Sequence, residues 1–230
     1  MGINVIAPAN KVCTLNCQYC QYGSTRIKHK QLRRGEFYLP ANTIIQELKF
    51  RLKNDSIKPD YITFSGNGEA TLHPEFSTLV EKVIALRDEL SPTARTAILS
   101  NGTQLILPEI RSAIGKLDVK IIKLDSANHQ VYARYNRPLF PVNTGQLVET
   151  LMAIKNLTVQ ALFCRGPAGN FSQSHLHAWI NTIQKIRPVM VQIYSLDRGY
   201  QSKKIIKLNK SDLQPLAESL ILCGIPAQVF

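Results

Sequence analysis

The sequence predicts an α/β fold in which parallel strands and helices alternate to form a partial (β/α)6 barrel resembling a TIM barrel. Three observations indicate it: β-rich runs alternate with amphipathic helical runs, no Gly/Ser linker divides the chain, and polar or glycine-rich segments follow the strands. Such alternation implies right-handed βαβ units and a parallel sheet. A flat doubly wound sheet is the alternative. We expect residues 1–230 to be a single domain, with a core at about 3–200 and a C-terminal helix and short strand at 210–230.

Six main strands are expected because short β-rich runs recur along the chain. They lie at residues 3–7, 61–64, 96–99, 119–124, 159–163 and 189–194. A short run at 227–230 is expected to close the chain.

Helices are expected between these runs, most of them because apolar residues recur at three- and four-residue spacing. They lie after Pro40, at 76–84, at 109–114, at 147–154, at 176–183 and after residue 210. Thr43 and Gln46 have the pattern of a capping box at the start of the first helix. Ser211 with Gln214 is expected to cap the last helix, and Gly224 is expected to end it.

Three cysteines lie close to the N-terminus, with three and then two residues between them: Cys13, Cys17 and Cys20. Thiolates select iron–sulfur clusters, zinc or copper. Because a four-iron cluster usually takes four thiolates, three from one loop would leave one iron open to an exogenous ligand. Structural zinc, the lesser alternative, needs four ligands. The remaining cysteines, Cys164 and Cys223, lie far apart and are expected to be buried thiols, and the odd count makes disulfides a poor interpretation.

The cysteine loop, with aromatic Tyr19 directly before its third cysteine, resembles the signature of the radical S-adenosylmethionine (radical SAM) enzymes. The resemblance implies that the three cysteines hold a [4Fe–4S] cluster whose fourth iron is chelated by the amino and carboxylate groups of S-adenosylmethionine. It also implies reductive cleavage to a 5′-deoxyadenosyl radical, an external one-electron reductant of the flavodoxin or ferredoxin type, and the partial barrel. Such radical chemistry belongs to the cofactor, and the protein positions and shields it.

The segments that follow successive predicted strands are all polar or glycine-rich, and in a barrel they would share the catalytic rim. Besides the cysteine loop, they are 65–69, 100–102, 125–126, 165–166 and 197–198. The helix-to-strand segments are shorter and plainer. This asymmetry indicates one functional face.

Gly66, Asn67, Gly68 and Glu69 follow the second strand. Glycines there let backbone carbonyls approach a ligand, although Asn-Gly alone marks only a turn. The run 63–72 resembles the family's second motif, in which this loop binds the methionine amino group. The resemblance implies that these four residues bind the cofactor.

Further cofactor-binding candidates follow the third and fourth strands. Ser100 and Asn101 resemble the segment that meets the ribose or methionyl end of the cofactor, and a plain turn is the alternative. Asp125 could bind a ribose hydroxyl or cap a helix beginning near Asn128. Lys123 alternates onto the same side of the strand as Asp125, which favours the pocket for both.

The adenine is expected to lie near Tyr19, with the backbone around Tyr194 completing that pocket. Substrate candidates are Lys123, Arg134, Arg137 and Arg198, because guanidinium groups recognise carboxylate or phosphate and Lys123 shares the pocket. Solvated surface is the alternative for the arginines. No catalytic residue is assigned beyond the cluster ligands.

The composition is basic, with 28 Lys and Arg against 16 Asp and Glu and a net charge of +12, which suggests an anionic partner. Nucleic acid is the usual one, but an acidic small molecule or peptide fits equally. Two clusters, with aromatic residues interleaved for base stacking, follow the cysteine loop and the sixth strand. They comprise Arg26, Lys28, His29, Lys30, Arg33 and Arg34, then Arg198, Lys203, Lys204, Lys207 and Lys210, with Tyr22, Phe37, Tyr38 and Tyr200. Solvated surface charge is the alternative.

Beyond the superfamily, residues 3–198 resemble a subgroup of short iron–sulfur oxidoreductases related to the wyosine-forming tRNA enzymes. Those enzymes carry a second cluster on additional cysteines, and this sequence has no second set. We therefore expect a one-cluster enzyme that abstracts hydrogen from an anionic substrate, an RNA base or a peptide. A glycyl-radical-enzyme activase, or a non-catalytic iron–sulfur or zinc protein that binds nucleic acid, are the alternatives. No apolar run approaches a membrane span, so a cytoplasmic protein without a membrane partner is expected.

Overall fold

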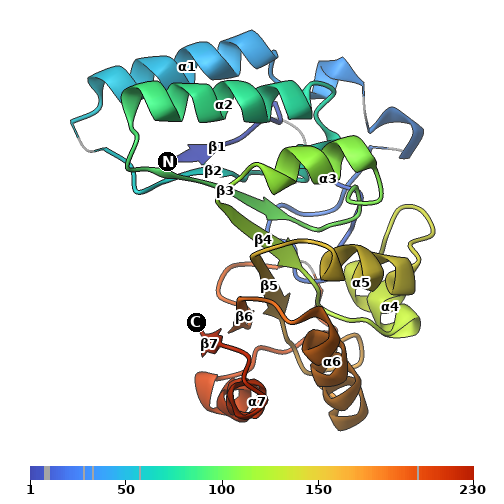
Figure 1. Ribbon diagram of the computed structural model, residues 1–230. Coiled ribbons are helices and arrows are strands. Elements are labelled where there is room, and N and C mark those ends of the chain that lie inside the picture. The colour runs from blue at the N-terminus through green and yellow to red at the C-terminus, as the bar shows by residue number, and fades with distance from the viewer. Residues whose placement is uncertain (8–10, 28, 33, 57, 201) are drawn as a thin grey trace.

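A computed structural model describes residues 1–7, 11–27, 29–32, 34–56, 58–200 and 202–230. Within them, seven strands form one parallel sheet whose spatial order is the chain order (Figure 1). The strands are β1 (Gly2–Ile3), β2 (Tyr61–Phe64), β3 (Arg95–Ser100), β4 (Val119–Lys123), β5 (Leu157–Leu162), β6 (Met190–Tyr194) and β7 (Ala227–Val229). A doubly wound sheet would reverse its strand order at a switch point. The sequential order therefore confirms the open partial barrel.

The helices follow one another around the outside of the curved sheet (Figure 1). They are α1 (Ala41–Asn54), α2 (Phe76–Leu90), α3 (Pro108–Gly115), α4 (His129–Asn136), α5 (Thr144–Met152), α6 (Gln173–Ile186) and α7 (Lys210–Leu222). Three short 3-10 turns lie at His29–Gln31, Gly35–Phe37 and Ala70–Leu72. Among the described residues, no helix is long and apolar enough to cross a membrane.

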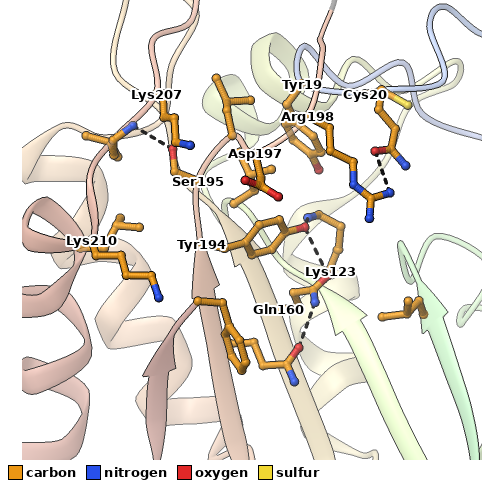
Figure 2. Close-up of a pocket in the computed structure, with 18 of the residues that line it drawn as sticks. Tyr19, Cys20, Lys123, Gln160, Tyr194, Ser195, Asp197, Arg198, Lys207 and Lys210 are labelled. Atoms are coloured by element: carbon orange, nitrogen blue, oxygen red, sulfur yellow. Dashed lines mark hydrogen bonds between the residues drawn. The ribbon is translucent and has the colours of Figure 1, made fainter. Parts of the chain in front are cut away.

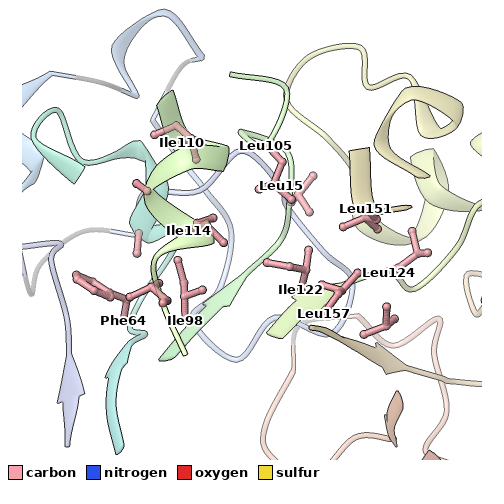
Figure 3. Close-up of a cluster of buried hydrophobic side chains, with 14 of the residues drawn as sticks. Leu15, Phe64, Ile98, Leu105, Ile110, Ile114, Ile122, Leu124, Leu151 and Leu157 are labelled. Carbon is pink, nitrogen blue, oxygen red and sulfur yellow. The ribbon is translucent and has the colours of Figure 1, made fainter. Parts of the chain in front are cut away.

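The hydrophobic core lies between the sheet and the helices. Strand residues alternate: Phe64, Ile98 and Ile122 are fully buried against helix residues such as Ile114 (Figure 3). Side chains one position away, on the inner face, are polar or partly exposed, as the alternating burial of β6 shows. A period of two on a sheet with one covered face produces this division. The inner face is therefore left for a ligand site.

Several local predictions were wrong. The first strand is only Gly2–Ile3, because the Asn4 side chain accepts a hydrogen bond from Ile6 N (3.3 Å) and turns the chain away from β2. Helix α1 has Pro40 at its N-cap with no side-chain cap. Cys223 is exposed, not buried.

The N-cap of helix α7 lies two residues before the predicted cap, Ser211. Asn209 is the N-cap, and Asp212 completes the capping box that had been expected of Ser211 and Gln214. Gly224, with φ of +76°, ends the helix as predicted. An Asn and an Asp three residues apart cap a helix at least as well as Ser and Gln. The local sequence therefore could not show which of the two pairs caps the helix.

Candidate functional site

The loops that leave the C-terminal ends of the strands meet at one rim. The cysteine loop lies among them and is held by backbone hydrogen bonds on both sides. Val12 bridges Gly68 in parallel register, and Glu69 N donates to Val12 O at 2.8 Å. On the other side, Asn16 N donates to Asn136 O at 3.1 Å and Gln18 N to Tyr135 O at 3.0 Å. The loop is thus held between the segment after β2 and the end of α4.

Backbone and amide N–H groups point at two of the three cysteine sulfurs. Cys13 Sγ accepts from Leu15 N and from Asn101 Nδ2, both at 3.4 Å, and Cys17 Sγ accepts from Asn136 Nδ2 at 3.5 Å. Burial raises the pKa of Cys13 to about 12 and that of Cys17 to about 11. Thiolates here need a compensating cation and N–H donors, which a bound iron–sulfur cluster and these amides would supply. The residues therefore fit a cluster.

The number of thiols in the cysteine loop bears on which metal group it would hold. Structural zinc takes four protein ligands, and this loop contributes three, Cys13, Cys17 and Cys20. Three thiolates leave one iron of a four-iron cluster open. The donor set therefore favours the cluster over zinc.

The loop after β2 is built for close approach of backbone. A Cβ added to Gly68 would lie 1.9 Å from Val12 O, and one added to Gly66 would lie 2.2 Å from Asn4 Oδ1. Asn67 is adjacent, with its Nδ2 3.5 Å from Ala7 O. These glycines are thus required where the loop meets its neighbours.

Glu69 is 1% exposed and joins the second and third rim loops. One carboxylate oxygen accepts from Ser100 Oγ (2.8 Å) and Thr71 Oγ1 (2.6 Å), and the other accepts from Asn101 N (2.7 Å). Burial raises the pKa of Glu69, and these donors oppose the rise. Both oxygens are occupied by protein donors, so the geometry gives Glu69, Ser100 and Asn101 a shared role in positioning the rim.

Asp125 is the centre of a second buried network. It accepts from Tyr19 Oη, from Asn136 Nδ2 at 2.6 Å and from Leu162 N at 2.8 Å. Asn128 caps α4 with its own side chain, so the capping alternative for Asp125 is wrong. Burial, followed by the charge of Asp125, raises the pKa of Tyr19, which keeps the phenol protonated as a donor. The carboxylate thus orients Tyr19 beside the cysteine loop.

Lys123 lies between two aromatic rings on the inner face (Figure 2). Its ammonium is 4.8 Å from the ring centre of Tyr19, 4.6 Å from that of Tyr194 and 3.5 Å from Asp125 Oδ1, and it donates to Tyr194 Oη. Burial by itself lowers the pKa of Lys123, but Asp125 and Tyr194 outweigh it and hold that pKa above its ordinary value. A cation is therefore fixed at the base of the site.

A cavity of about 940 Å³ opens above this cation (Figure 2). Tyr19 and Cys20 of the cysteine loop form part of its wall, and Leu99, Lys123, Gln160, Gln192 and Tyr194 come from the inner face of the sheet. The cluster loop and the inner face of the barrel thus border one space.

The structure separates the predicted substrate residues. Lys123 and Arg198 line the cavity, and Arg198 also donates to Gln21 Oε1 at 3.3 Å. Arg134 donates to Gly169 O at 2.9 Å, and Arg137 has a left-handed φ of 49° at the end of α4; neither is part of the cavity lining. Of the basic cluster after the cysteine loop, Lys28 and Arg33 lie outside the described residues.

Gln160 and Gln192 line the cavity but were not among the predicted site residues. They lie at inner positions of β5 and β6, and Gln160 Nε2 donates to Gln192 Oε1 at 2.9 Å. The sequence contains a pattern that could have indicated them, because each is a polar residue inside a mostly apolar strand. Gln192 also lies two positions from Tyr194 and therefore on the same face of β6.

The family model described as "Radical SAM superfamily" matches residues 9–161, which is more than half of the chain. The chain belongs to the radical SAM superfamily. This membership confirms the predicted family and makes the chain a radical SAM enzyme whose cofactors are a [4Fe–4S] cluster and S-adenosylmethionine. Enzymes of this family also need an electron donor.

Two curated relatives of this radical SAM chain are similar over nearly its whole length. A UPF0026 protein of Helicobacter pylori (strain J99) is 26% identical over 218 residues, covering 93% of this chain and 67% of the relative. A Brachyspira hyodysenteriae protein named GTPase Obg is 28% identical over 219 residues, covering 93% of this chain and 30% of that protein. The chain therefore spans only part of each relative.

Solved structures of radical SAM proteins share the fold. Streptococcus suis SuiB bound to S-adenosylmethionine has a TM-score of 0.71 at 14% identity, covering 100% of this chain and 51% of SuiB. Archaeal TYW1 has a TM-score of 0.55 at 14% identity, covering 85% of this chain and 66% of TYW1. At these identities the likeness shows the fold alone, and it confirms the partial barrel.

Proposed function

We propose that this chain is a one-cluster radical SAM enzyme that abstracts hydrogen from an anionic substrate bound in the cavity. The observation that carries the proposal is the shared wall: Tyr19 and Cys20 of the cysteine loop line the same space as Lys123 on the inner face of the sheet. A radical generated at the loop would thus be enclosed together with the substrate.

Cys13, Cys17 and Cys20 would hold the cluster. When bound, the cluster and S-adenosylmethionine supply one-electron reductive cleavage and the 5′-deoxyadenosyl radical. The protein's own part is to position and shield. Asn101 and Asn136 donate to two of the cysteine sulfurs, and Glu69 fixes the loop after β2 against that after β3.

The cofactor would occupy the side of the cavity nearest the cysteine loop. Gly66 and Tyr19 line the cavity there, while Asn67, Gly68, Glu69, Ser100, Asn101 and Asp125 support that wall. The barrel wall excludes water and stray reductants from the radical. A flavodoxin- or ferredoxin-type protein would supply the electron.

An anionic substrate is favoured by the charge of the remaining lining. Lys123 at the end of β4 and Arg198 in the segment after β6 both line the cavity, and a low-dielectric site strengthens their attraction for a negative group. RNA, whose phosphates accompany the reacting base, and an acidic peptide both meet this requirement. The resemblance to the wyosine-related proteins is in line with RNA.

The test is anaerobic reconstitution with iron and sulfide, reduction, addition of S-adenosylmethionine and measurement of 5′-deoxyadenosine. Wild-type protein should release it, and Cys17→Ala should not. Cys223→Ala is the matched control, because that thiol is exposed and is not part of the cysteine loop. A wild-type protein that holds a full cluster yet releases no 5′-deoxyadenosine would instead favour the non-catalytic iron–sulfur module, and release that rises only with a glycyl-radical partner would favour the activase.

A further inference from the structure

The wall of the cavity formed by the segment after β6 is basic. Arg198, Lys207 and Lys210 line it, against Asp197 as the acid among the described lining residues. In the described part of the chain, neither the Lys207 nor the Lys210 ammonium group has a hydrogen-bond or ion-pair partner. Figure 2 shows both on the side of the cavity away from Cys20. Two unpaired ammonium groups thus face the part of the cavity that lies away from the proposed cofactor position.

This wall is fastened to the barrel. Arg165 and Ile206 form an antiparallel bridge, with Arg165 N donating to Ile206 O at 3.0 Å and Ile206 N to Arg165 O at 2.8 Å. Leu208 N donates to Ser195 Oγ at 2.9 Å, and Ser195 Oγ donates in turn to Phe163 O at 2.8 Å. Because both ends of the short run 206–208 are anchored, Lys207 is presented to the cavity from a fixed backbone.

The floor beneath this wall suits a planar polar group. Gln160 and Gln192 join side-chain amides at 2.9 Å, and Tyr194 Oη donates to Gln160 Oε1 at 3.3 Å. Amide and phenol side chains offer both donors and acceptors, and the polar edge of a nucleobase needs both. The cavity volume, about 940 Å³, is at the upper end of the range of roughly 300–1,000 Å³ for one drug-sized ligand. It can hold a second group besides the cofactor.

We propose that Lys207 and Lys210 bind the phosphate of a nucleotide unit whose base rests on the floor formed by Gln160, Gln192 and Tyr194. The inference rests on the proposed function and names its substrate class. Ammonium groups act as point charges for phosphate. A single peptide carboxylate would leave the second lysine unpaired, whereas a phosphate shares its charge among several oxygens. The unit can be a free nucleotide or part of a single strand.

The experiment measures binding by the reconstituted, unreduced protein with saturating S-adenosylmethionine, so that the cofactor's own site is filled. The probes are a short fluorescent single-stranded RNA, the four nucleoside monophosphates and polyglutamate. Each phosphate contact to a single strand contributes a slope of about −0.7 in log K against log salt, or roughly fivefold in affinity at about 0.1 M salt. Both lysines bind one phosphate in this proposal, so K207E/K210E should weaken RNA binding by roughly fivefold or more and flatten the salt slope by about 0.7.

Lys203→Glu with Lys204→Glu is the matched control, because it makes the same charge change on the same segment but neither side chain lines the cavity. It should weaken binding far less. Equal loss in both variants, tighter binding of polyglutamate than of RNA, or no binding of any nucleotide probe would each overturn the inference. Binding of monophosphates alone would support it and identify a free nucleotide. Release of 5′-deoxyadenosine by the wild-type protein without added probe tests the proposed function separately.

Discussion

The side-chain amide of Asn136 donates to Cys17 Sγ at 3.5 Å and, in the same orientation, to Asp125 Oδ2 at 2.6 Å. The carboxylate therefore holds the amide in the position where it meets a thiolate of the proposed cluster. Hydrogen bonds to cluster sulfurs stabilise the more negative, reduced state and raise the reduction potential. Asn136 thus connects the Asp125 network to the redox centre.

Replacing Asn136 with Leu, which has a similar volume and no donor, should lower the cluster's reduction potential. A differential of about 1 kcal/mol corresponds to roughly 40 mV for one electron, so a shift of tens of millivolts is expected. The measurement is an EPR-monitored redox titration. Asn101→Leu should act in the same direction through Cys13, and Asn54→Leu on the exposed surface of α1 should have no effect. An unchanged or raised potential in N136L would show that the contact does not reach the cluster.

Lys123→Met should destabilise the protein by about 3 kcal/mol, because it leaves the buried Asp125 carboxylate without its cation. Chemical denaturation of the cluster-free protein measures this change. The double variant K123M/D125N removes both charges, so its loss should be clearly smaller than the sum of the two single losses. Additive losses would mean that the two charges do not stabilise one another.

Gly68→Ala should disrupt the cysteine loop, because its Cβ would lie 1.9 Å from Val12 O. The backbone must move, and the Glu69 N to Val12 O hydrogen bond at 2.8 Å should be lost with it. We expect about 1–3 kcal/mol lower stability and a reduced iron content after reconstitution. Gly115→Ala, which meets nothing within 4 Å, is the control and should keep both at wild-type values. Normal iron loading of G68A would contradict the proposed role of this contact.

Asp118 gives a pH-dependent prediction far from the cavity. Burial alone raises its pKa, but Thr96 N–H (2.7 Å) and Arg87 (2.7 Å) donate to it and outweigh burial, so its pKa lies below the ordinary value. A lowered pKa in the folded state gives stability that is present above the ordinary pKa of Asp and is lost as pH falls through the folded value. Asp118→Asn should cost about 1 kcal/mol at neutral pH.

The cost of D118N should shrink as pH falls from the ordinary pKa of aspartate through the lower pKa of folded Asp118, because the carboxyl is protonated first in the unfolded and then in the folded wild-type protein. Urea denaturation at neutral and acidic pH measures this difference. A cost that stays constant with pH would mean that the hydrogen bonds matter and the charge does not.

The fold could be predicted from the sequence because the period of the apolar residues and the alternation of strand and helix runs determine it. Helices α2 and α6 have apolar residues at three- and four-residue spacing, and strand β4 has alternating burial. Each of these elements differs from its predicted range only at its ends. The first strand failed because Asn4 turns the chain, a side-chain effect that a run of apolar residues does not reveal. Helix caps failed where two neighbouring pairs of polar residues were equally suitable.

The site was only partly predictable. The cysteine loop is contiguous, so spacing indicates it, and alternation correctly placed Lys123 beside Asp125. Contacts between distant segments leave no local pattern: Asn136 meets Cys17 across 119 positions of sequence. The same distance explains why Arg134 and Arg137 seemed equivalent to Arg198 until the fold placed only Arg198 in the cavity lining.

The property that defines the proposed site is an iron of the cluster on Cys13, Cys17 and Cys20 that stays open to S-adenosylmethionine beside the cavity. We would record the EPR spectrum of the reduced, reconstituted protein with and without S-adenosylmethionine. We expect a [4Fe–4S] signal whose g values shift when S-adenosylmethionine binds, and no such cluster signal in Cys17→Ala. A cluster whose spectrum is the same with and without S-adenosylmethionine would contradict it.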